Sequence, residues 1–160
     1  MLINRVSLKN FKCFKQVDID LAPITLLTGE NSSGKSSLLY SLLAPFQSND
    51  FPFYLSPNGK YVNMGDFEEM SFNRLRDNQV EISISTKTQF GEDENYQTVW
   101  VIDPTNRMPK LNYLRFTNFI LDFEVKLNQI YIVNCNVDET SLQLHLDVPR
   151  RNNEEADVED

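Results

Sequence analysis

Residues 29–37, "GENSSGKSS", hold two glycines, four serines and a lysine between an apolar run typical of a strand and one typical of a helix. The stretch from Gly29 to Ser36 matches the pattern G-x-x-x-x-G-K-[ST] at every fixed position. Glycines permit backbone angles and a close approach that a Cβ would prevent, so successive N–H groups can turn toward phosphate oxygens. A helix that begins there adds unpaired N–H groups and the positive end of its dipole. The segment therefore predicts a loop that wraps the phosphates of a nucleoside triphosphate.

The side chains of this loop have separate expected tasks. Lys35 would bridge the terminal phosphates, the Ser36 hydroxyl would enter the coordination shell of Mg²⁺, and Ser37 would lie near the α-phosphate. The predicted binding residues of the loop are Asn31, Ser32, Ser33, Gly34, Lys35, Ser36 and Ser37, with Ser36 as the metal ligand. A serine-rich turn that only caps a helix would also account for Ser32 and Ser33. The position of the motif between a predicted strand and a predicted helix favours the phosphate loop.

The elements that must position the loop can be predicted from apolar periodicity. Residues 2–8 and 17–28 predict strands, and the second of these ends in the apolar run 24–27. Residues 36–43 predict a helix that Pro45 stops. Strand, glycine turn and helix follow one another in the order that a phosphate-binding loop needs.

The rest of the chain predicts an antiparallel sheet. Residues 47–65 are loop-like, and the short piece "GDFEEMSF" predicts a helical turn or two. The alternating segments "VEISIS" and "YQTVWVID" predict a β-hairpin, and "FILDFEV", "QIYIVNC" and "SLQLHLDV" repeat the pattern. Their connections are too short for parallel crossovers, so residues 60–148 are expected to form an antiparallel β-rich part. Residues 149–160 are acidic and predict a disordered tail.

Composition limits the class of protein. A chain of 160 residues with 41% hydrophobic residues predicts one domain with a packed core. Its net charge of −8 argues against a chain-wide nucleic-acid footprint, which would need a basic face. Cys13 and Cys135 have neither metal-ligand spacing nor a disulfide framework, and they predict reduced thiols. No apolar run approaches the roughly 20 residues that span a bilayer, so a soluble, cytoplasmic protein without membrane contact is expected.

The opening of the chain resembles a known family. The stretch "LKNFKCFKQVDIDLAPITLLTGENSSGKSSLLYSLL" resembles the N-terminal signature of ABC-type ATPases of the RecF, SMC and OLD group. It is most similar to the OLD-like "AAA ATPase" branch, which is common in bacterial and phage-defence systems. Residues 1–46 carry this resemblance strongly, and "YLSPNGKYVNMGDFEEM" supports it more loosely. The later strands resemble the β-subdomain of the first ABC lobe in pattern alone.

The resemblance implies a fold, a nucleotide and further contacts. The fold would be α/β (α+β), a P-loop NTPase in which residues 1–148 form the N-terminal lobe of an incomplete ABC-type head and 1–46 its P-loop unit. ATP with Mg²⁺ would be bound, and Asn10 to Phe14 would lie near the base and sugar. Lys12 would approach a phosphate or the ribose, and Phe14 would pack near the adenine. Alternatively, Phe11 and Phe14 are core residues of a hairpin, and Lys12 belongs to an exposed charged face with Lys9 and Lys15.

Several motifs that the resemblance leads us to expect are missing from the sequence. A Walker B strand would supply an Asp for Mg²⁺ and a Glu that orients the attacking water, and a signature helix would complete the clamp on the γ-phosphate. Asp103 is followed by Pro104 in the place of the base, and Asp138 with Glu139 looks like a turn. No Ser-Gly-Gly-Gln segment occurs, and the single histidine, His145, is expected on the polar side of a strand. No catalytic residue is therefore assigned.

Three origins fit this pattern: a fragment, a naturally split gene product, or a small protein that binds nucleotide without hydrolysing it. The leading hypothesis is an ATP- and Mg²⁺-binding component of an OLD/RecF/SMC-like machine in anti-phage defence or DNA processing. Its partner would be another protein or a second copy of the chain, paired through ATPase heads, and DNA would be touched only indirectly. ATPase activity is expected only with the missing half or a partner. The alternative is a non-catalytic nucleotide-binding module that regulates or pairs with a full-length ATPase, and a nucleoside kinase fits the antiparallel pattern less well.

Overall fold

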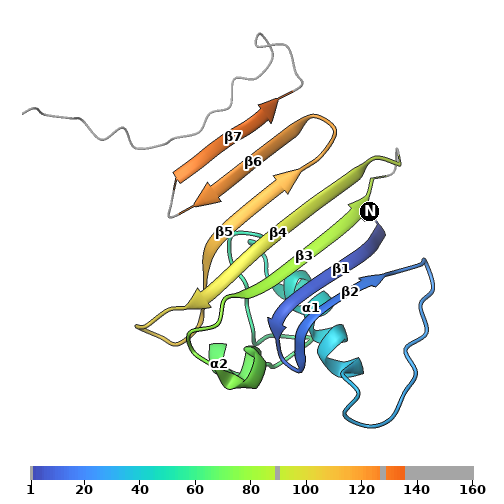
Figure 1. Ribbon diagram of the computed structural model, residues 1–160, viewed down its shortest axis with the longest axis vertical. Helices are drawn as coiled ribbons and strands as arrows, with labels where there is room; N and C mark the ends of the chain where they lie inside the picture. The colour runs from blue at the N-terminus through green and yellow to red at the C-terminus, as the bar shows by residue number, and fades with distance from the viewer. Residues whose placement is uncertain (1, 89–90, 127–128, 136–160) are drawn as a thin grey trace, which may run out of the picture.

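The computed structural model describes residues 2–88 and 91–126 in full, and the backbone of residues 129–135 (Figure 1). The described chain forms one sheet with the strand order β2-β1-β3-β4-β5-β6-β7, and every neighbouring pair is antiparallel. The strands are β1 (Leu2–Phe11), β2 (Phe14–Asp20), β3 (Val80–Lys87), β4 (Asp93–Ile102), β5 (Pro109–Thr117), β6 (Leu121–Lys126) and β7 (Gln129–Cys135). The helices are α1 (Lys35–Gln47), α2 (Phe67–Met70) and the 3₁₀ helix η1 (Phe72–Arg74).

Alternation along the strands gives the sheet one apolar face and one polar face. The register pairs Leu8 with Ile82 and Val80 with Trp100, and all four side chains are buried on the apolar face. The predicted hairpin of "VEISIS" and "YQTVWVID" is present as β3 and β4. Neighbouring side chains on a strand point to opposite faces, so a strict period of two fixes this register. Segment 141–148, the pair Asp138–Glu139 and the acidic tail lie outside the described residues.

Helix α1 lies against the apolar face of the sheet, on the side of β1 and β3 (Figure 1). Its buried positions include the small residues Ser41 and Ala44, together with Leu38. The prediction that Pro45 stops this helix was wrong, because α1 continues to Gln47 and the Ser48 N–H bonds to the Pro45 carbonyl at 3.2 Å. A proline lacks only its own N–H donor, and in the last turn of a helix that loss does not end the helix at the proline.

The second prediction that the structure corrects is the strand over residues 17–28. Strand β2 ends at Asp20, and residues 21–30 belong to no strand. The Ala22 N–H bonds to the Thr25 hydroxyl at 3.0 Å, which forms a local turn. Ile24 is 92% exposed and Leu26 is 84% exposed. Apolar alternation predicts a strand because it predicts burial, and no described segment lies beside this stretch to bury it. The described part is therefore mostly antiparallel sheet with few helices, and it lacks the strand expected directly before the loop.

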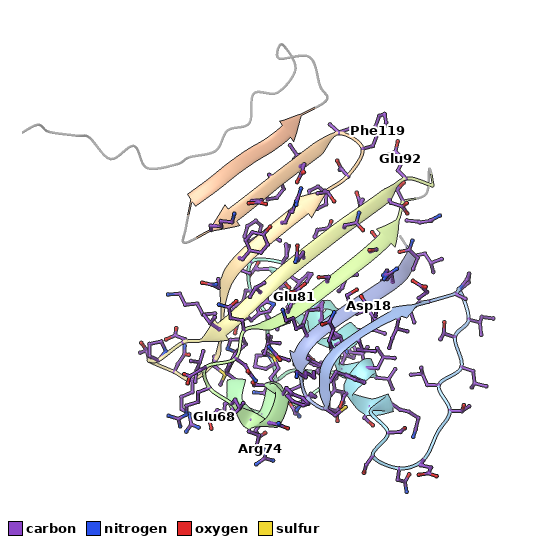
Figure 2. All side chains as sticks on the ribbon, in the orientation of Figure 1. Asp18, Glu68, Arg74, Glu81, Glu92 and Phe119 are labelled. Atoms are coloured by element: carbon purple, nitrogen blue, oxygen red, sulfur yellow. The ribbon has the colours of Figure 1, made fainter. Side chains whose placement is uncertain are left out.

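The predicted helical turn in "GDFEEM" is present as α2. The Asp66 carboxylate caps it by accepting a hydrogen bond from the Glu69 N–H at 3.2 Å, and Phe67 and Met70 are buried. Figure 2 shows Glu68 and Arg74 beside this helix at one end of the sheet, with Glu92 and Phe119 at the opposite end. Among the described residues, no helix has the length and apolar content needed to cross a membrane.

Candidate phosphate-binding site

The glycine-rich segment forms a tight loop that leads directly into α1. Gly34 is the N-cap of α1 and has a φ of 94°, and Ser32 has a φ of 64°. Glycine adopts such positive φ values without the steric cost that a side chain brings. The helix begins at once, because the Leu38 N–H bonds to the Gly34 carbonyl at 2.9 Å. The expected order of glycine turn and helix is therefore present.

Lys35 turns its ammonium group back over this loop. The Nζ atom donates to the Gly29 carbonyl at 2.8 Å, to the Glu30 carbonyl at 2.6 Å and to the Ser33 hydroxyl at 3.1 Å. The side chain thus brings one positive charge onto the loop that precedes its own helix. A fixed cation beside a helix N-terminus favours anionic oxygens, because charge and dipole act in the same direction.

The predicted loop residues line one shared cavity of about 220 Å³. Its lining consists of Cys13, Asn31, Ser32, Ser33, Gly34, Lys35, Ser36 and Ser37. The structure therefore brings together all seven predicted positions of the loop. It adds Cys13, which the sequence analysis did not assign to the site. The signal was present in the order of residues, because Cys13 lies within the segment Asn10 to Phe14 that the family resemblance placed near the nucleotide.

The β1–β2 turn reaches the loop through Cys13 and Phe14. A Cβ added at Gly34 would stand 2.8 Å from Phe14 Cζ and 3.0 Å from Cys13 Sγ. These distances are shorter than ordinary van der Waals contact, so only glycine fits at position 34 without displacing this turn. Phe11 is fully buried in the core, as the alternative interpretation of the aromatic residues expected. Phe14 is partly buried and packs against both the core and Gly34.

Lys12 is placed beside this turn, but its ammonium group has other partners. Nζ donates to the Met64 carbonyl at 3.1 Å and lies 5.7 Å from the centroid of the Tyr40 ring. Burial lowers the pKa of Lys12, and the positive charge of Arg74 acts in the same direction, whereas Glu69 raises it. Lys12 is not among the residues that line the loop cavity. Its contact with a nucleotide stays a prediction.

The segment that holds Lys12 is itself fixed by ion pairs. Arg107 lies 3.0 Å from Asp66 and 2.8 Å from Glu68, and Arg76 also pairs with Glu68. The Phe67 N–H bonds to the Arg107 carbonyl at 2.9 Å. Individually such exposed pairs are worth about 0–1 kcal/mol, but together they tie α2 to the β4–β5 turn. The platform beneath the β1–β2 turn is thereby anchored to the sheet.

No carboxylate lines the loop cavity within the described chain. Asp103 lies in the β4–β5 turn, where its carboxylate accepts from the Thr105 N–H at 2.8 Å and its N–H bonds to the Met108 carbonyl at 2.8 Å. These contacts give Asp103 a role in the turn. Over the described ranges, no group of three or more His, Cys, Asp or Glu side chains could hold a metal ion.

Comparison with known proteins identifies the family. The chain matches the family model of the AAA ATPase domain over residues 1–159. It belongs to that family. The chain is also similar to the OLD nuclease of Thermus scotoductus (strain ATCC 700910 / SA-01), with 34% identity over 41 residues. That match covers 26% of this chain and 8% of the nuclease. The predicted resemblance to OLD-like AAA ATPases is thus confirmed, and this AAA ATPase domain is a nucleotide-binding ATPase-family member.

Proposed function

We propose that this AAA ATPase domain binds ATP with Mg²⁺ at the loop of residues 29–37, as one component of an OLD/RecF/SMC-like ATPase machine. The observation that carries the proposal is the cavity in which Lys35 and the N-terminus of α1 converge. Triphosphate oxygens are the groups that such a convergence of N–H donors and one cation recognises.

Binding is the first test. Titration of the purified chain with a fluorescent ATP analogue should give a dissociation constant that Lys35→Ala raises at least tenfold. Lys60→Ala is the matched control, because Lys60 is exposed and its ammonium group lies over the ring of Tyr61. An equal affinity in the Lys35→Ala variant would contradict the proposal.

Ser36 is the residue that would hold the metal ion. It is exposed at the start of α1 and lines the same cavity as Lys35. A serine hydroxyl is a hard oxygen ligand of the kind that Mg²⁺ accepts beside phosphate oxygens. Bound Mg²⁺ neutralises part of the phosphate charge. Ser36→Ala should therefore reduce the dependence of ATP affinity on Mg²⁺, whereas Ser36→Thr should retain it.

Hydrolysis would require residues from outside this cavity. Its lining contains no acid that could orient a water molecule. The apolar surface next to it also lacks a cover, since Ile24 and Leu26 are exposed and Phe46 on α1 is 73% exposed. A helix that is apolar on its outer side as well as its inner side is typical of a buried helix. We infer that further polypeptide, from the same protein or from a partner, covers this surface and carries the acidic and signature motifs.

Anti-phage defence or DNA processing in the cytoplasm is the setting that we propose. The similar protein named OLD nuclease supports it, although the match covers only 8% of that protein. The net charge of −8 favours contact with DNA through partners rather than through this chain.

Mass photometry with and without ATP and Mg²⁺, alone and with the products of neighbouring genes, tests the composite machine. ATP-dependent assembly onto a larger protein, with weak turnover by the chain alone, is expected. Substantial Mg²⁺-dependent turnover by the purified 160 residues would contradict a composite machine.

The second candidate is a non-catalytic module that regulates or pairs with a full-length ATPase. The absence of an acid among the residues that line the cavity favours it. In that case Lys35→Ala weakens assembly with the partner and leaves the partner's intrinsic turnover unchanged. Gel filtration of the mixed proteins distinguishes the two candidates, since unchanged assembly of the Lys35→Ala variant would exclude this second role.

A further inference from the structure

The thiol of Cys13 belongs to the wall of the cavity formed by the phosphate loop. Cys13 is exposed and its sulfur is free. The sulfur lies 3.0 Å from the position that a Cβ on Gly34 would occupy, so it faces the residue at which α1 begins. Every other residue that lines this cavity comes from the loop or the first turn of α1. A group attached to this sulfur therefore enters the space next to the loop.

The turn that carries Cys13 is held in place on both sides. The Lys12 N–H bonds to the Met70 carbonyl at 2.7 Å, and the Lys12 ammonium group bonds to the Met64 carbonyl at 3.1 Å. On the other side the ring of Phe14 packs on Gly34. These contacts leave the backbone no room to carry a modified sulfur away from the loop. Rotation about the side-chain bond of Cys13 is the freedom that remains.

We propose that Cys13 is a modification site that controls access of nucleotide to the phosphate loop. The modifying reagents are low-molecular-weight disulfides, of which glutathione disulfide is the example, and the inference rests on the proposed binding of ATP to this loop. Bound nucleotide covers the thiol, and a bulky group on the thiol excludes nucleotide. The two events compete for the cavity of about 220 Å³.

The reaction is a thiol–disulfide exchange that balances without a further oxidant. The Cys13 thiol gives up its proton, and its sulfur attacks one sulfur of glutathione disulfide. The disulfide bond of the reagent breaks, a mixed disulfide forms at Cys13, and one glutathione leaves as a thiolate that takes up a proton. Dithiothreitol reverses the reaction by the same exchange.

The attached tripeptide opposes ATP binding by size and by charge. It is linked to the wall of the cavity and extends over the N–H groups at the start of α1. Its two carboxylates supply negative charge next to Lys35, where the triphosphate would otherwise bind. Loss of affinity should therefore increase with the size and negative charge of the attached group.

The experiment uses the full chain with Cys135→Ser as background, so that Cys13 is its single cysteine. Peptide mass spectrometry measures modification at Cys13, and titration with a fluorescent ATP analogue measures affinity before and after treatment. Circular dichroism confirms that the treated protein stays folded. Methyl methanethiosulfonate, which adds only a methylthio group, provides the small-adduct comparison. The matched control is Cys13→Ser in the same background, treated in parallel.

Glutathionylated protein should lose at least tenfold in ATP affinity and regain it with dithiothreitol, and the methylthio adduct should lose less. Saturating ATP with Mg²⁺ should slow the modification of Cys13 at least fivefold. Treated and untreated Cys13→Ser protein should bind ATP with the same affinity. If fully modified, folded protein binds ATP as before, or if saturating ATP leaves the modification rate unchanged, Cys13 does not control the site. If untreated protein fails to bind ATP at all, the proposed function itself is wrong, and the inference is wrong with it.

Discussion

Phe14 and Gly34, twenty positions apart, are packed so closely that a Cβ on Gly34 would stand 2.8 Å from Phe14 Cζ. The contact joins the β1–β2 turn to the residue at which α1 begins. Gly34 also has a φ of 94°, which side chains rarely adopt. The conformation of the phosphate loop is thus fixed by packing from outside the loop as well as by its own glycines.

Gly34→Ala should abolish ATP binding. The new methyl group meets Phe14 and Cys13, so the loop or the turn has to move away from the binding conformation. The matched control is Gly91→Ala, because Gly91 has a φ of 82° and an added Cβ there meets nothing within 4 Å. Both changes introduce backbone strain of roughly 1–2 kcal/mol, visible in thermal unfolding. Equal loss of ATP affinity in both variants would show that strain alone, and not the contact with Phe14, is responsible.

A buried hydrogen-bond relay in the sheet should make Thr98 sensitive to replacement. The Trp100 indole N–H donates to the Thr98 hydroxyl at 2.9 Å, and that hydroxyl donates to the Ile82 carbonyl at 2.8 Å. Thr98→Val keeps the shape but leaves a fully buried indole N–H without its acceptor, which costs about 1–3 kcal/mol. Urea unfolding measures this loss, with exposed Thr105→Val as the control. A change below about 0.5 kcal/mol would mean that the indole finds another acceptor.

The sequence predicted those features that depend on local order. The motif from Gly29 to Ser36 specifies the loop through the residue types themselves, and the alternation in β3 and β4 specifies which face each side chain takes. The place of Cys13 was missed, because it depends on how the β1–β2 hairpin folds over the start of α1. No periodicity records a contact between the residues at positions 13 and 34.

The incorrect strand over residues 17–28 has a different physical cause. The apolar run from Ile24 to Leu27 carries the signal of a buried strand, yet Ile24 and Leu26 are exposed. The burial that the pattern encodes requires a neighbour that the described chain does not supply. Sequence pattern and structure agree once a covering polypeptide is added, as the proposed composite machine requires.

Leu26→Ser tests this interpretation by separating stability from assembly. Because Leu26 is 84% exposed, its replacement should change the free energy of unfolding by no more than about 0.5 kcal/mol. Leu55→Ala, at a fully buried position, should cost about 2–5 kcal/mol and serves as the comparison. Mass photometry should then show that Leu26→Ser weakens assembly with the partner. A variant that is strongly destabilised in the isolated chain would mean that Leu26 is already covered there.

The pH dependence of stability should reveal the ion pairs on the polar face of β5 and β6. Arg115 contacts Asp122 through two hydrogen bonds, at 2.8 and 3.1 Å, and this pairing holds the pKa of Asp122 below its ordinary value of 3.8. A carboxyl with a depressed pKa in the folded state stabilises the fold above its unfolded pKa, and that contribution is lost as the pH falls through the folded pKa.

Asp122→Asn should therefore be less stable than the parent chain at pH 7, and the difference should shrink as the pH falls below 3.8. Urea unfolding at a series of pH values measures both proteins. Asp77→Asn, at an exposed position, is the matched control. Glu124 has the same direction of shift, because hydrogen bonds from Lys126 and Tyr113 lower its pKa, so the Asp122→Asn variant keeps part of the acid dependence. A difference between parent and Asp122→Asn that stays constant from pH 7 to pH 3 would show that the pair acts through packing rather than through charge.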